Sequence, residues 1–415
     1  MYELGAIVTA LVLLVVLLRL KVRLGRSMVF CAVALGFLLR VGPMEIWRTL
    51  AAEWQDKPLA RTTGYMFVSL TALLLLVNVI GQAMMEVGIS RRILPAMQGL
   101  FRSRRFALAL IPMLMGLLPS PGGIMLSAPM VREAGDKIGV SRSRLAAINF
   151  HFRHQWECIW PLFPSIPLIQ GMLGVEAYKI ICYNLALTAA GFLGGAIFLL
   201  SFGIPAKQPG HEPEKHRWGE HLQDFVQAFW PIALAAGLYA GLGWPPAVGI
   251  LLGILGLLIL HRVPLGRWGN VFKAGAQLDM ALLILGALSF KVVLEAGAAI
   301  GRVVEFLTAA NIPPECLIFL LPFFVGFTTG VTLPSVAITF PLLLGFIGTG
   351  EQTNMALETL AFSGVLCGLF LTPVHLCIAL SASYFETPLA GVILKLLGPT
   401  ILVGLAGIMV AMLLG

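Results

Sequence analysis

Five polar side chains crowd into residues 151–157 of one short, largely apolar stretch, NFHFRHQWECIWP at residues 149–161. They are His151, Arg153, His154, Gln155 and Glu157. Ionisable residues inside a hydrophobic segment are costly and indicate a functional site by default. On a helix, His154 and Glu157 lie side by side, and so do Arg153 and Glu157. We therefore predict that Arg153, His154 and Glu157 form a gate or a proton relay. A structural ion pair at the mouth of the site is the alternative.

A metal site in the same stretch is not predicted. His151, His154 and Glu157 have suitable side chains, but no H-E-x-x-H motif or second cluster of ligands accompanies them. The six cysteines form no C-x-x-C pair and fall in or beside apolar segments. We interpret them as small buried hydrophobic residues. No cofactor is predicted, and only Na⁺ or H⁺ is expected as a coupling ion.

Hydroxyls, glycines and prolines interrupt apolar sequence at four places. Two are PSPGG at 119–123 and TTGVTLPS at 328–335, and the others are WPLFPSIP at 160–167 and LTPVH at 371–375. Broken helices at membrane depth aim amide ends at anions and free carbonyls at cations. Ordinary packing of small residues is the alternative. The breaks give the predicted binding residues Ser120, Pro121, Gly122, Gly123, Ser165, Thr328, Thr329, Gly330, Thr332, Ser335, Thr372 and His375.

The composition excludes an ordinary soluble protein. Hydrophobic residues make up 58%, charged residues only 12%, and the mean hydropathy is +0.92. Apolar segments long enough for a bilayer lie at 1–20, 64–87, 178–202, 244–261, 276–297 and 389–413. The first has its positive charges after the apolar run, so it reads as an uncleaved helix and not a signal peptide. The net charge of +8 resides in loops, which favours membrane topology over nucleic acid as its explanation.

Landmarks recur in the same order at an offset of about 210 residues, which indicates an internal repeat. The pairs are Glu86 with Glu295, Gly88 with Gly297, Pro112 with Pro322, Gly116 with Gly326, Pro129 with Pro341, and Pro161 with Pro373. The chain therefore divides into a first half at 1–203, a polar cytoplasmic linker at 204–224 and a second half at 225–415.

The distribution of lysine and arginine orients the two halves. Cationic loops at 19–26, 91–105, 132–144 and 262–273, with the linker, are placed in the cytoplasm. Residues 106–131 are too few for two spans and both flanks are basic, so a re-entrant hairpin is expected there. A second, from the opposite side, is expected at about 316–347. We predict two inverted repeats of five transmembrane helices and one hairpin each, with both termini outside a cell (inner) membrane. Amphipathic interfacial helices are expected at 44–54 and 267–273, and an ion pair between Lys291 and Glu295.

With its re-entrant hairpins before broken helices, the chain resembles the ion-transporter superfamily, which includes divalent-anion/sodium symporters, gluconate permeases and the membrane subunits of TRAP carriers. LLPSPGGIMLSAP and TTGVTLPSVAITFP look closest to a ten-span prokaryotic family in it whose function is unknown. The resemblance implies an all-α protein with scaffold and transport domains, an elevator mechanism and a homodimer. The Ser-Asn-Thr signatures that bind sodium in the dicarboxylate members are absent from both tips, which weakens the inference of sodium coupling and of a dicarboxylate substrate.

These features predict a secondary active transporter of a small organic or inorganic anion, with a carboxylate favoured, coupled to a sodium or proton gradient. A channel built on re-entrant hairpins and a cation exchanger are the alternatives. No nucleophile–base spacing indicates an enzyme, and no nucleic-acid partner is expected. GFIGTG at 345–350 is not followed by lysine and does not constitute a P-loop.

Overall fold

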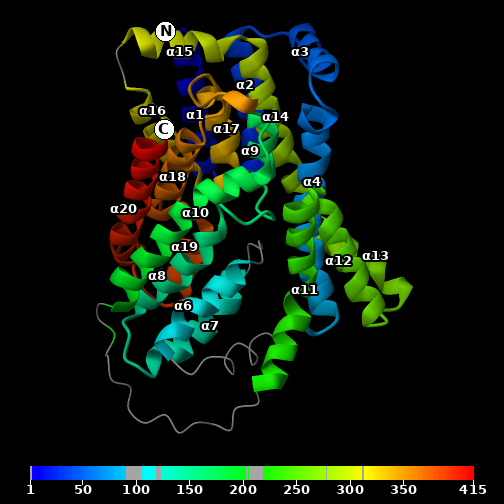
Figure 1. Ribbon diagram of the computed structural model, residues 1–415, viewed down its shortest axis with the longest axis vertical. Helices are drawn as coiled ribbons and strands as arrows, with labels where there is room; N and C mark the ends of the chain where they lie inside the picture. The colour runs from blue at the N-terminus through cyan, green and yellow to red at the C-terminus, as the bar shows by residue number, and fades with distance from the viewer. Residues whose placement is uncertain are drawn as a thin grey trace.

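The computed structural model describes residues 2–89, 104–117, 123–201, 204, 218–276, 278–310 and 313–415. Within these ranges every regular element is a helix, as Figure 1 shows. The six long apolar segments of the sequence all form helices, because a backbone surrounded by hydrocarbon must satisfy its own hydrogen bonds. The protein is an all-α polytopic membrane protein, as predicted.

The first half begins with three apolar helices and one amphipathic helix, then two short facing helices, a broken helix and a final long helix. In order, they are α1 Tyr2–Arg19, α2 Leu24–Leu39, α3 Pro43–Asp56, η1 Leu59–Arg61, α4 Thr63–Glu86, α6 Arg104–Gly116, α7 Gly123–Asp136, α8 Arg142–His151, η2 Phe152–Trp156, α9 Ser165–Leu173, α10 Ala177–Gly194 and η3 Gly195–Ser201.

The second half repeats this order of elements. In sequence, they are α11 Trp218–Leu242, α12 Pro246–Leu260, α13 Leu265–Gly275, α14 Leu278–Ala296, α15 Ala299–Ala309, α16 Pro314–Thr329, α17 Thr332–Ile347, η4 Gly350–Gln352, α18 Met355–Leu371, α19 Leu376–Tyr384 and α20 Leu389–Leu414. Both segments expected to be interfacial, 44–54 and 267–273, fall inside the amphipathic helices α3 and α13.

Five helices of the described residues are long and apolar enough to cross a membrane, or up to seven if each bent pair counts as one span. The five are α1, α4, α10 with η3, α18 through α19, and α20, and the bent pairs are α2 with α3 and α13 with α14. Counting α11, α12 and the broken α8–α9 as well gives the ten spans expected from the sequence. The number of ten spans, the inverted orientation of the two halves and the division of the chain at 204–224 remain predictions.

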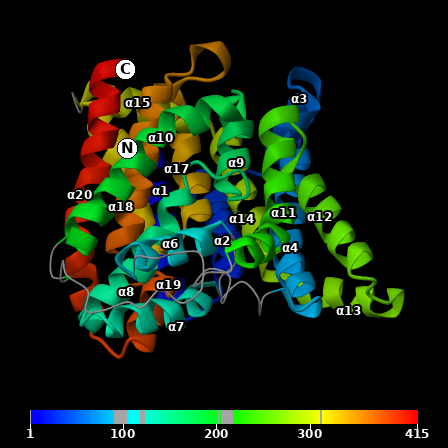
Figure 2. The ribbon, with the colours of Figure 1, turned by 60° about the horizontal axis from the view of Figure 1, so that its bottom comes forward.

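Two groups of helices lie side by side (Figure 2). Helices α3, α4, α11, α12 and α13 form one group, and α2 and α14 pack against each other next to it. Helices α8, α10, α16, α18, α19 and α20 form the other, with α6 and α7 at one end. Helix α17 contacts α14 on one side and α16, α18 and α9 on the other, so it lies between the groups.

A buried ion-pair network ties α3 and α4 of the first group to α14. Lys291 on α14 donates to Glu53 Oε1 of α3 at 2.9 Å, to Thr63 Oγ1 of α4 at 3.1 Å and to Glu295 Oε2 at 3.1 Å. The predicted pairing of Lys291 with Glu295 is therefore confirmed. Glu53 Oε2 also accepts from the Thr63 amide at 2.8 Å. With all three ammonium protons engaged, the network fixes α3 against α4 and α14.

Glycines allow helices of the second group to pack with their backbones in contact. A Cβ added to Gly326 of α16 would lie 2.7 Å from the carbonyl oxygen of Val365 on α18. A Cβ added to Gly116 of α6 would overlap the carbonyl oxygen of Arg153 in η2. Both glycines thus lie on the first helix of a facing pair and contact the backbone of the interrupted helix that follows, Gly326 at α18 and Gly116 at the break itself.

Candidate functional site

Helices α16 and α17 form a helical hairpin with a two-residue turn at Gly330 and Val331. Gly330 has φ +65°, the left-handed conformation that favours glycine at the end of a helix. Its absent side chain also matters, because a Cβ would lie 2.9 Å from the backbone nitrogen of His375. The segment predicted as a hairpin tip therefore packs directly against the helix break that carries His375.

The break at 371–375 lies between α18, which ends at Leu371, and α19, which begins at Leu376. Thr372 Oγ1 donates to the carbonyl oxygen of Phe327, in the last turn of α16. Thr372 is fully buried, and Pro373 follows it. The break thus leaves α18 and α19 with their facing ends at the tip of the hairpin.

The break in the first half begins before the predicted segment 160–167. Helix α8 already ends at His151, a short 3₁₀ turn follows at 152–156, and turns continue to Pro164, before α9 starts at Ser165. Pro161 and Pro164 lack amide hydrogens and cannot continue an α-helix, which accounts for the later part of the interruption, up to the start of α9. The polar residues Arg153, His154 and Glu157 consequently lie in the break itself.

The two breaks and the hairpin meet in a buried polar cluster, which we call the central cluster: His154, Glu157, Thr332 and His375. Thr332 Oγ1 donates to Glu157 Oε2. Glu157 Oε1 lies 3.7 Å from His154 Nε2, and His154 Nε2 lies 3.2 Å from His375 Nε2. Their residues are 5–8% exposed. The cluster therefore joins elements of both halves in a closed interior.

Arg153 extends from the same break toward the first pair of facing helices. Its Nη1 donates to the carbonyl oxygen of Met115 at 2.6 Å, in the last turn of α6. A guanidinium at this position satisfies a free carbonyl and opposes the negative end of the helix dipole. Arg153 is 5% exposed. The structure thus places its positive charge in the interior and ties it to α6.

Three predicted hydroxyls on the hairpin bond to backbone carbonyls of the hairpin. Thr328 Oγ1 donates to Phe324 O at 2.9 Å, Thr329 Oγ1 to Val325 O at 2.8 Å, and Ser335 Oγ to Val331 O at 2.7 Å. Thr329 and Ser335 also pair at 2.8 Å. Thr332 differs, since it donates to Glu157 in the other half of the chain. Among these four, Thr332 has the contact that a site role requires.

The remaining predicted residues lie at the margin of the central cluster or outside the described residues. Ser165, at the start of α9, is 1% exposed, and its Oγ lies 3.5 Å from the carbonyl oxygen of Glu157. Gly123 is the first residue of α7. The prediction for Ser120, Pro121 and Gly122 concerns residues that the structure does not describe.

His151 faces away from the central cluster. Its Nε2 lies 2.8 Å from the carbonyl oxygen of Gly191 on α10, and Gln155 Nε2 lies 3.3 Å from the same ring nitrogen. Thr188 Oγ1, also on α10, donates to the carbonyl oxygen of Gln155 at 3.0 Å. These contacts hold the break against α10 and separate His151 from His154, although the two lie close in sequence.

Sequence reasoning missed two buried polar contacts around the site. Asn149 on α8 accepts from Ser127 Oγ of α7 at 2.6 Å and donates to Ser381 Oγ of α19 at 3.3 Å. Asn184 on α10 donates to Glu358 Oε1 of α18 at 3.2 Å. Asn184 is a polar residue in an apolar run and Asn149 begins the polar stretch 149–157, signals that point to burial with a partner but do not identify the partner.

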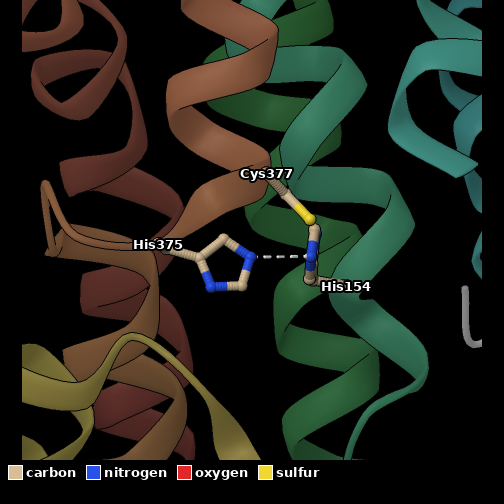
Figure 3. A group of neighbouring side chains, drawn as sticks. All are labelled: His154, His375 and Cys377. Atoms are coloured by element: carbon tan, nitrogen blue, oxygen red, sulfur yellow. Dashed lines mark hydrogen bonds between the residues drawn. The ribbon is translucent and has the colours of Figure 1, made fainter. Parts of the chain in front are cut away.

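A third missed feature is Cys377, the second residue of α19. Ligand atoms of His154, His375 and Cys377 all lie within 4.8 Å of one another. In Figure 3 the ring of His375 and the sulfur of Cys377 both approach His154. No sequence motif relates the members of this group, because 221 residues separate the two histidines.

The described residues define a polytopic helical membrane protein with a closed polar cluster where two helix breaks and a helical hairpin meet. The chain belongs to the family described as Protein of unknown function (DUF401), whose model matches residues 4–415. Among solved structures, the chain is similar to the YdaH transporter of Alcanivorax borkumensis, at 15% sequence identity and a TM-score of 0.58. That similarity covers 85% of this chain and 86% of that chain. A search of curated proteins gives no match.

Proposed function

We propose that the protein is a secondary active transporter that moves a small anion, with a carboxylate favoured, across the cell membrane. The observation that carries this proposal is the central cluster, in which Thr332 of the hairpin contacts Glu157 of one helix break and His375 of the other break contacts His154. Broken helices at matching positions of two halves are the best pointer to the substrate site of a transporter. The fold shared with the YdaH transporter supports the same class.

The arrangement of helix ends favours an anion as the substrate. Helix α17 begins at Thr332, α19 begins directly after His375, and α9 begins at Ser165 next to Glu157. The amino-terminal end of a helix presents amide hydrogens and a partial positive charge, so several such ends around one point favour an anion. The buried guanidinium of Arg153 adds a full positive charge. We assign Arg153, His154 and Glu157 to a gate beside this anion site.

We also propose an elevator mechanism, in which the group containing α16–α19 moves against the group containing α3, α4 and α11–α13. The closed central cluster supports alternating access, since its four residues are at most 8% exposed. The matched order of elements, and the matched contacts at Gly116 and Gly326, support two inverted repeats of five transmembrane helices and one re-entrant hairpin each. We expect a homodimer in the inner membrane with both termini outside. In Figure 1 the two termini lie toward the end of the molecule that carries α15.

A cation exchanger is the second candidate, because the central cluster contains a carboxyl group and two imidazoles that a cation could also use. Ligand-induced thermal stabilisation of the detergent-purified protein distinguishes the two. A ligand that binds only the folded protein raises its melting temperature. We would test carboxylates, other oxyanions and monovalent cations, each with and without sodium and at two pH values.

The matched variants are Thr332→Val and Thr339→Val. Both threonines lie on α17 and are buried, but the hydroxyl of Thr339 donates to its own helix, to Ser335 O at 2.7 Å. We expect a saturable shift with an anion that disappears in Thr332→Val and persists in Thr339→Val. Uptake of that anion into proteoliposomes, driven by a sodium or a proton gradient, then identifies the coupling ion. A saturable rise in melting temperature with a cation, and none with any anion, would reject the proposed substrate class. Ion flux through the proteoliposome membrane that does not saturate with substrate concentration would favour a channel.

A further inference from the structure

The contact between His154 and His375 is unusual because two ring nitrogens with lone pairs face each other. His154 Nδ1 lies 2.7 Å from the carbonyl oxygen of Phe150, and His375 Nδ1 is hydrogen-bonded to the carbonyl oxygen of Gly330. A carbonyl oxygen accepts hydrogen bonds and cannot donate, so each Nδ1 carries the hydrogen. In the neutral rings both Nε2 atoms are therefore bare acceptors, yet they lie 3.2 Å apart. A cation bound between the two nitrogens, either a proton or a metal ion, would remove the repulsion between their lone pairs.

The separation of the two nitrogens matches ligands of one metal ion. Zinc–nitrogen bonds of about 2.0–2.1 Å at a tetrahedral angle put two ligating nitrogens about 3.3 Å apart. The observed Nε2–Nε2 distance is 3.2 Å. A nitrogen and a sulfur on the same ion would lie about 3.6 Å apart. Cys377 Sγ lies within 4.8 Å of a ring nitrogen of each histidine, so it is near enough to be considered as a third ligand of the same ion.

The surroundings of the two rings supply what a metal site needs beyond its ligands. Histidines that bind metals nearly always donate their other ring hydrogen to a carbonyl or a carboxylate, which fixes the orientation of the ring. His154 and His375 both do so, through Phe150 O and Gly330 O. Glu157 Oε1, 3.7 Å from His154 Nε2, adds an acidic group beside the site to balance the charge of a buried cation.

We propose that His154, His375 and Cys377 bind a transition-metal ion of the zinc class. Two imidazoles and a thiolate select such ions over sodium, magnesium and calcium, which take oxygen ligands. Three protein ligands leave a fourth position for water or for an oxygen of an anion. The site stands on the three side chains and does not depend on the proposed transport of an anion. Because the ligands come from both breaks, a bound ion links the first half of the chain to the second.

Cobalt(II) is a direct probe of this site, because its absorption reports both tetrahedral geometry and thiolate ligation. Purified protein, stripped of metal with a chelator, would be titrated with Co²⁺ and then with Zn²⁺ as a competitor. The variants are Cys377→Ser and His375→Ala. The matched controls are Cys367→Ser, a buried cysteine on α18 that contacts Thr400 O, and His151→Gln, which faces α10.

We expect one Co²⁺ per chain, intense tetrahedral bands and a thiolate-to-cobalt charge-transfer band, all removed by Zn²⁺. Cys377→Ser should lose the charge-transfer band, His375→Ala should bind at least about 100-fold more weakly, and the two controls should behave as the unchanged protein. The melting temperature without metal establishes that each variant is folded, and the rise on adding Zn²⁺ gives a second measure of binding. The proposal would be overturned if Co²⁺ did not bind, or if it bound equally well to Cys377→Ser and His375→Ala. A proton shared between the two rings would then explain the contact between His154 and His375.

Discussion

The hydroxyl of Thr332, the first residue of α17, donates a hydrogen bond to the carboxyl group of Glu157 in the helix break of the other half. Both residues are buried, at 7% and 5% exposure. A donor at the start of a helix and an acceptor in an irregular segment hold the hairpin tip to the break. Within the part of the chain that the structure describes, this is the one hydrogen bond by which a predicted hydroxyl of the hairpin reaches across the two halves.

The contact between Thr332 and Glu157 should appear as an energetic coupling. In a double-mutant cycle of Thr332→Val and Glu157→Gln, we expect the free energies of unfolding to be non-additive by about 1 kcal/mol or more. Reversible unfolding in mixed detergent micelles measures it. The control cycle replaces Thr332→Val with Thr339→Val, whose hydroxyl bonds to Ser335 O, and should be additive. Additive effects in both cycles would contradict the role of Thr332.

Gly330 should tolerate no side chain, for reasons of space as well as backbone conformation. Gly330→Ala introduces a Cβ 2.9 Å from the His375 nitrogen, in addition to the cost of a left-handed residue, about 1 kcal/mol. Gly350 is a matched control, because its φ is +62° and a Cβ there would meet no atom within 4 Å. We expect Gly330→Ala to lower the melting temperature clearly more than Gly350→Ala. Equal losses would show that the hairpin tip does not press on the break.

Local features of the sequence predicted most of the helices, the turn at Gly330 and the helix break that follows Leu371. Long apolar runs must be helical in a membrane, and Pro373 or Gly330 interrupts a helix wherever it occurs, so these elements are encoded locally. The contacts that build the central cluster join residues separated by 175 and 221 positions. No periodicity or motif relates such positions. The apolar surroundings of Cys377 and the lack of a C-x-x-C pair indicate a packing residue, although it lies beside the two histidines in the structure.

The predicted hydroxyl groups at the hairpin tip differ in the partners to which they donate hydrogen bonds. Thr328, Thr329 and Ser335 each donate to a carbonyl of the hairpin, as hydroxyls in membrane helices commonly do. Composition alone cannot distinguish such a hydroxyl from Thr332, since the difference depends on which face of α17 meets the break. The start of the first break was also placed too late, because the sequence signal is strongest at the prolines and the α-helix already ends at His151.

The paired glycines Gly116 and Gly326 give a prediction about the internal repeat. Alanine at Gly116 would overlap Arg153 O, and alanine at Gly326 would bring a Cβ 2.7 Å from Val365 O. We expect each substitution to separate two helices and to destabilise the protein by about 1–3 kcal/mol. Gly81→Ala on α4 is the control, since a Cβ there meets no atom within 4 Å, and it should be neutral or slightly stabilising. Tolerance of alanine at one paired position and not the other would contradict an equivalent role.

Glu358 should be replaceable by glutamine but not by alanine. It is fully buried, and its Oε1 accepts from Asn184 Nδ2 at 3.2 Å, while Glu358 Oε2 and Asn184 Oδ1 have no hydrogen-bond partner among the described residues. Glutamine keeps the shape and supplies an amide hydrogen that Asn184 Oδ1 can accept. We expect Glu358→Gln to change the free energy of unfolding by less than about 1 kcal/mol, and Glu358→Ala to cost about 2–3 kcal/mol. A loss in Glu358→Gln as large as that in Glu358→Ala would show that the carboxyl group itself is required.

Lys291 should contribute far more to stability than the neighbouring Lys57, although both pair with Glu53 at 2.9 Å. The side chain of Lys291 is 3% exposed and that of Lys57 is 41% exposed. Removing Lys291 leaves the carboxyl group of Glu53 buried without its interior partner, and such a loss costs about 3–5 kcal/mol. An exposed pair contributes at most about 1 kcal/mol. We therefore expect Lys291→Met to lower the melting temperature strongly and Lys57→Met only slightly. If Glu53→Gln restores the stability lost in Lys291→Met, the unpaired carboxyl group of Glu53 is the cause of the loss. Equal losses of stability in the two lysine variants would contradict the role of the buried network.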